Sequence, residues 1–125
     1  MNNMKYKYVQ NVMSDDSCNM FTNWIKHKSK ENNLTGDDQI PESTSLHSSN
    51  DHFMRAILYH LKERIEYETC LKLQPTYAYT RLYYFGSDLK RHRDRPSCEI
   101  SCTLTVNYDY LNKDYQWPIY MGETP

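Results

Sequence analysis

The chain has 125 residues, of which 38% are hydrophobic and 12 are tyrosine, so it suits one domain whose core has polar margins. Its 15 basic and 16 acidic residues nearly cancel, which gives no electrostatic support for a nucleic-acid or membrane partner. No stretch has the length and apolarity of a transmembrane helix or a signal peptide. The four cysteines form no CxxC pair, so free thiols in a reducing compartment and a cytoplasmic location are expected.

The first third of the chain is predicted to hold a short strand, a helix and a long loop. Residues 5–12 alternate weakly around two tyrosines, which indicates a strand. Ser14 then offers an N-cap for a helix that ends near Lys30. Its apolar face is predicted at Cys18, Phe21, Trp24 and Ile25. Residues 31–50 are polar and are expected to form a long loop.

The middle of the chain predicts a second helix and then a strand. The helix should begin at residues 49–51 and end at residues 67–70. Its apolar stripe is predicted at Phe53, Ile57, Leu61 and Ile65. Residues 75–85 are dense in aromatic and β-branched side chains, which is typical of a strand, and Gly86 begins the break after it.

The last quarter carries the clearest strand pattern. Residues 99–107 alternate apolar and mostly hydroxyl side chains, and a further strand is predicted to begin within residues 116–121. Two helices followed by several strands indicate an α+β fold.

His92 and Asp94 are the main candidates for chemistry. On an extended segment, residues i and i+2 project to the same face, so the imidazole and the carboxylate point together. They would supply two ligands of the 2-His-1-carboxylate site used by non-haem Fe(II) oxygenases. The third ligand should be a later histidine, and none follows His92. The competing interpretation is a solvated ion pair in a turn rich in lysine and arginine.

Flanking residues make the pattern more specific. Tyr83-x-x-Gly86 precedes the His-x-Asp pair, a run from Arg95 to Ser101 follows it, and Trp117 comes later with Pro118 and Ile119. From Asp38 onward the chain resembles the 2-oxoglutarate/Fe(II)-dependent dioxygenases. The resemblance is closest to a prolyl-4-hydroxylase-like branch common in phages and marine microbes.

The resemblance implies a fold and a set of site residues. The fold would be a partial double-stranded β-helix of the jelly-roll or cupin-like type, with two supporting N-terminal helices. His92 and Asp94 would bind Fe(II), and Tyr83 would contact the cosubstrate 2-oxoglutarate, with Tyr84 as the adjacent alternative. Arg81 shares the face of Tyr83 and would either line this pocket or pair with a carboxylate.

The family pattern also requires a distal histidine and a later arginine or lysine, which the sequence lacks after Trp117. We therefore expect a single domain over residues 1–125 whose final strands are missing, an N-terminal portion of such an enzyme. The expected activity is hydroxylation of prolyl or other protein side chains, or of a small molecule. It would use O2, Fe(II) and 2-oxoglutarate, with ascorbate as an accessory reductant. The alternative is an inactive fragment that serves as a binding or assembly module.

Overall fold

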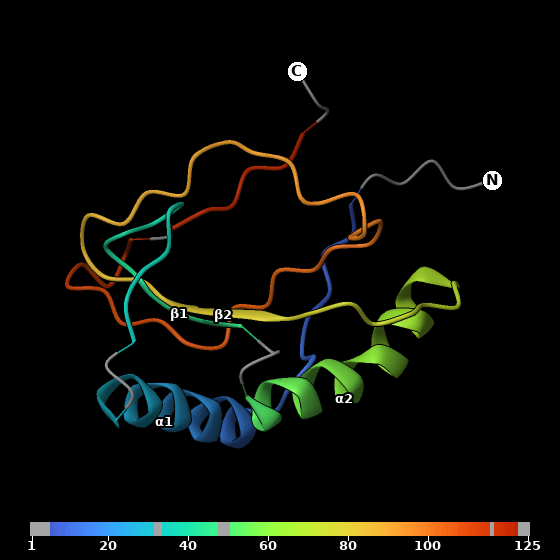
Figure 1. Cartoon of the computed structure of the whole chain (residues 1–125), viewed down its shortest axis with the longest axis horizontal. Helices are drawn as coiled ribbons and strands as arrows, with labels where there is room; N and C mark the ends of the chain where they lie inside the picture. Colours follow the sequence, from blue (N-terminus) through green and yellow to red (C-terminus); the bar gives the residue numbers. More distant parts are fainter. Residues whose placement is uncertain (1–5, 32–33, 48–50, 116, 123–125) are drawn as a thin grey trace.

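The computed structural model describes residues 6–31, 34–47, 51–115 and 117–122. Within them the element order is α1 (Asp15–Glu31), β1 (Thr44–His47), α2 (His52–Thr69) and β2 (Tyr79–Leu82). Figure 1 shows both helices on one side of the small sheet, while the chain after β2 arches over the other side. Part of this chain returns to the helices, because Asn107 donates a hydrogen bond to Thr22 of α1 at 3.2 Å.

Helix α1 follows the sequence prediction closely. The hydroxyl of Ser14 accepts a hydrogen bond from the Ser17 N–H at 3.1 Å, which satisfies one of the free donors of the first turn. Aspartates in the first turn and lysines in the last turn match the helix dipole. Phe21 and Ile25 are the buried residues of the predicted apolar face.

Helix α2 also lies where the sequence predicts it. Its N-cap is Asp51, whose Oδ1 accepts from the Met54 N–H at 3.1 Å. Its C-cap is Cys70 in the left-handed conformation, with φ of 57°. Lys28 near the end of α1 pairs with Asp51 at 3.1 Å, so one carboxylate both caps α2 and ties it to α1. Neither helix in the described part of the chain is both long enough and apolar enough to span a bilayer.

The sheet differs from the prediction. Strand β1 lies inside residues 31–50, where a continuous loop was expected, and pairs antiparallel with β2. The four residues of β1 contain one large apolar side chain, Leu46, so they show no alternation of apolar and polar residues. The strand forms because it pairs with β2. Strand β2 occupies only Tyr79–Leu82 of the predicted residues 75–85.

Three other strand predictions find no strand among the described residues. Residues 6–12, 99–107 and 117–121 have no regular structure, while Lys5 and Gln116 lie outside the described residues. A strand needs a neighbour that exchanges backbone hydrogen bonds with it, and the described sheet has only the β1–β2 pair. The α+β content is present, in the order helix, strand, helix, strand. The double-stranded β-helix stays a prediction.

The core lies between the helices and one face of the sheet. Phe21, Ile25, Leu46 and Met54 form the buried cluster. Phe21, Trp24 and Phe53 pack as an aromatic trio with ring centroids 4.6–5.7 Å apart. Leu46 and Thr80 are paired in register, and the Thr80 hydroxyl contacts the Met54 sulfur at 2.6 Å. This contact directs one face of β2 toward the helices.

Met54 and Met20 provide a matched test of this core. Met54 is 2% exposed, whereas Met20 is 57% exposed. We expect Met54→Ala to lower the free energy of unfolding by about 2–5 kcal/mol, because it leaves a cavity between α2 and the sheet. Met20→Ala should change it by less than about 1 kcal/mol. Urea denaturation followed by circular dichroism measures both, and equal losses would contradict this account of the core.

Candidate functional site

The sheet face opposite the helices carries the predicted cosubstrate residues. Because side chains alternate along a strand and Thr80 faces the core, Tyr79 and Arg81 project to the other side. Ser45 is the register partner of Arg81, and its hydroxyl lies 3.1 Å from that of Tyr79. A polar surface therefore covers the side of the sheet away from the core.

Arg81 is held by Asp37, an acidic residue for which the sequence predicts no role. Its Nη2 lies 2.5 Å from Asp37 Oδ2 and 2.6 Å from Gln39 Oε1. The Tyr79 hydroxyl donates to the same Asp37 oxygen at 2.8 Å. The other oxygen, Oδ1, accepts the Ile40 N–H at 2.9 Å. Of the two roles considered for Arg81, pairing with a carboxylate is the one that these contacts display.

The ionisation of this pair follows from its contacts. Burial alone would raise the pKa of Asp37, but hydrogen bonds from Arg81, the Ile40 N–H and Tyr79 lower that pKa to about 2. For Arg81, burial alone would lower the pKa, while hydrogen bonds with Asp37 and Tyr83 raise it overall. Both groups are therefore charged at neutral pH.

The segment that carries Asp37 is closely packed. Ile40 is fully buried, and the Ser45 N–H donates to the Thr35 carbonyl at 3.1 Å. A side chain at Gly36 would overlap the carbonyls of Ile40 and Pro41. Residues 34–43 thus form an ordered arm beside β1. A periodic pattern in the sequence reports only contacts between near neighbours. Asp37 could not be found in this way, because its partner Arg81 is 44 residues away and the contact depends on how the arm packs.

Tyr83 and Tyr84 take different directions, as expected for neighbours on an extended segment. Tyr83 is close enough to Arg81 to help raise the pKa of that guanidinium, and the Tyr83 ring packs edge-on against Trp117 with centroids 4.7 Å apart. Tyr84 is half-exposed, and its hydroxyl accepts from Thr44 at 3.4 Å. The structure thus brings Arg81 and Tyr83 together and leaves Tyr84 apart from them.

His92 and Asp94 form the second pair of predicted residues. Their Nε2 and Oδ1 atoms are 3.5 Å apart, and the side chains are 36% and 50% exposed. His92 Nδ1 lies 2.8 Å from the Lys90 carbonyl oxygen. A carbonyl only accepts, so Nδ1 carries the proton in the neutral ring and Nε2 keeps its lone pair on the side of Asp94.

Among the described residues, this pair has no third metal ligand within reach. Across the described residues, no three His, Cys, Asp or Glu side chains gather closely enough to hold a metal ion. Next to this pair in the sequence, Arg95 lies 5.9 Å from the ring centroid of Tyr77, which precedes β2 by two residues. A hydrogen bond with Cys98 is the main cause of the raised pKa of Tyr77, and the charge of Asp94 adds to it.

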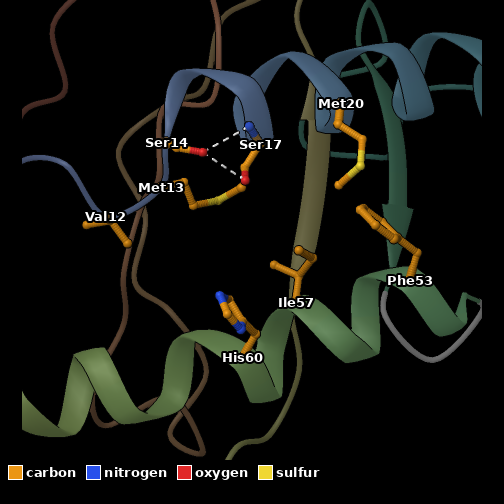
Figure 2. A pocket seen from close by; sticks show the side chains of 8 residues that line it. All are labelled: Val12, Met13, Ser14, Ser17, Met20, Phe53, Ile57 and His60. Atoms are coloured by element: carbon orange, nitrogen blue, oxygen red, sulfur yellow. Dashed lines mark hydrogen bonds between the residues drawn. The ribbon is translucent and has the colours of Figure 1, made fainter.

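A cavity of about 250 Å³ lies elsewhere, between the first turn of α1 and the middle of α2. Figure 2 shows His60 and Ile57 pointing into it from α2 and Met20 from α1. The hydroxyls of Ser14 and Ser17 at its rim bond to each other at 3.0 Å as part of the helix cap. None of the predicted site residues lines this cavity.

Comparison of the chain with protein-family models, curated proteins and solved structures finds no match. The dioxygenase resemblance therefore continues to depend on the motif residues themselves. Of these, the structure pairs His92 with Asp94 and Arg81 with Tyr83.

Asp37 predicts a pH dependence of stability. A carboxyl group whose pKa falls from 3.8 to about 2 on folding stabilises the protein above pH 4, and this stabilisation disappears as the pH falls through 2. Because the side chain is 24% exposed, we expect about 1 kcal/mol from it. Urea unfolding between pH 2 and 6 should show this difference between wild type and Asp37→Asn. Asp109→Asn, at a carboxylate that is 91% exposed, should keep the wild-type pH profile. An unchanged profile in Asp37→Asn would contradict the assignment.

Proposed function

We propose that this chain carries an iron(II)-binding half-site and belongs to a 2-oxoglutarate-dependent hydroxylase. The observation that supports this most directly is the pair His92 and Asp94, with Nε2 and Oδ1 at 3.5 Å. An imidazole nitrogen and a carboxylate oxygen are the donor types of the non-haem iron site.

The donor pair is compatible with a shared metal ion. Two donors at about 2.1 Å from one metal lie roughly 3.0–3.4 Å apart for angles between a right angle and the tetrahedral angle, close to the observed separation. The bond between His92 Nδ1 and the Lys90 carbonyl resembles the outer-shell contact that orients metal-ligating histidines. Two ligands hold a metal weakly, so the proposal includes a third protein ligand from another polypeptide segment.

The proposed reaction consumes O2 and 2-oxoglutarate and releases succinate and CO2, with one oxygen atom inserted into a C–H bond of the substrate. Bound iron(II) would activate O2 for this step. The protein's own residues bind and orient: Arg81 offers a guanidinium for a carboxylate of 2-oxoglutarate, and the Tyr83 hydroxyl adds a hydrogen bond beside it. We propose a prolyl or other protein side chain as the substrate and ascorbate as the accessory reductant.

The proposed location is the cytoplasm. All four cysteines, Cys18, Cys70, Cys98 and Cys102, are free thiols, and a reducing compartment favours that state.

A second candidate function is a binding or assembly module without catalysis. It is favoured by large apolar side chains that are exposed after β2, among them Phe85, Leu111 and Tyr120. Under this hypothesis, His92 and Asp94 are only a surface ion pair in a basic turn.

Iron binding separates the two candidates. We expect the wild-type chain to bind Fe(II) weakly, through these two ligands alone, under anaerobic conditions in equilibrium dialysis, and His92→Ala or Asp94→Ala to weaken the affinity by at least roughly 10-fold. His60→Ala, on α2, serves as the control and should bind as wild type does. Succinate release with Fe(II), 2-oxoglutarate, O2 and ascorbate is the second readout. Turnover that persists in Asp94→Ala would refute the site, and Fe(II) binding that is absent, or equal in wild type and both variants, would favour the assembly module.

A further inference from the structure

We propose that Asp37 is an internal competitor that occupies the carboxylate-binding edge of Arg81 and limits access of a small dicarboxylate. This inference depends on the proposed function for the identity of the ligand, 2-oxoglutarate. The competition itself follows from the contacts of Arg81. The edge of its guanidinium that best binds a carboxylate, formed by Nε and Nη2, is only partly occupied.

The first observation is that only one of the two nitrogens on the Nε–Nη2 edge of the Arg81 guanidinium has hydrogen-bond partners in the described part of the chain. Nη2 binds both Asp37 and Gln39. Nε, on the same edge of the fork, is buried and has no hydrogen-bond partner among the described residues. A buried donor on a charged group without a partner is costly, so a better acceptor arrangement would be favoured.

The second observation explains why Asp37 does not fill the fork. Arginine and carboxylate pair most strongly through two parallel hydrogen bonds, one to each oxygen. Asp37 uses Oδ2 for Arg81 and Tyr79, while the Ile40 N–H holds Oδ1. The arm that carries Asp37 is packed around the buried Ile40, so its carboxylate is held in this one-oxygen geometry.

A free dicarboxylate has no such constraint. It would present two oxygens to Nε and Nη2 once Asp37 has moved away, and it would gain the contact that Asp37 lacks. A neighbouring hydroxyl suits an anion as well: Tyr83 lies beside Arg81, and its O–H can donate to a carboxylate held there. Because Asp37 must leave first, the observed affinity equals the intrinsic affinity multiplied by the small open fraction.

The test measures binding of 2-oxoglutarate, and separately of succinate, to the full chain by calorimetry in EDTA. Because EDTA removes metal ions, the result does not depend on iron binding. If the chain fails to bind iron, this test still measures 2-oxoglutarate binding at Arg81, and if this test fails, the iron-binding experiment still stands. We expect Asp37→Asn to bind both probes about five- to tenfold more tightly than wild type, because the open fraction rises. Asp38→Asn removes the same charge from the adjacent exposed position and should bind as wild type does. Asp37→Asn combined with Arg81→Gln should lose the gain.

Unchanged or weaker binding by Asp37→Asn, or an equal gain in Asp38→Asn, would overturn the proposal. A second measurement applies even if Asp37→Asn does not fold. In wild type, the Nε–H resonance of Arg81, assigned through Arg81→Lys, should move downfield as 2-oxoglutarate is added. A resonance that stays in place at saturating probe would overturn the proposal as well.

Discussion

The pairing of β1 with β2 is the constraint on which the rest of this structure depends. It sets Leu46 beside Thr80 on the face that packs against Phe21, Ile25 and Met54. By alternation, the same register sets Ser45 and Arg81 on the opposite face. A shift of one residue would exchange the two faces and bury the charged guanidinium, which is why the hydrophobic core and the polar network depend on each other.

The helices support this pairing from one side only. Asp51 caps α2 and binds Lys28 of α1, so the two helices meet the sheet as one layer. On the other side, the arm with Asp37 and the chain after β2 provide polar and aromatic contacts in place of a second core. The proposed site lies on that side, which carries Arg81 and Tyr83. Arg95, next to Asp94, contacts Tyr77 just before β2.

The helices were predictable because their signals are local. Ser14 caps α1, the first-turn aspartates match its dipole, and the i, i+3 spacing of apolar residues marks the face that Phe21 buries. The strands were less predictable because a strand is defined by its partner. Residues 99–107 have a clear alternation and no described neighbour to pair with, whereas the inconspicuous residues of β1 become a strand through β2.

The sequence by itself determined the two helices and the Ser14 N-cap of α1, and it selected His92 with Asp94 and Arg81 with Tyr83. Helical capping and the i, i+2 relation are short-range properties of the chain, so residue order is enough to predict them. Only the tertiary structure decided that Asp37 is the partner of Arg81 and that Tyr84 stands apart. Those contacts join segments about 40 residues apart, and their formation depends on how the arm and the two strands pack together.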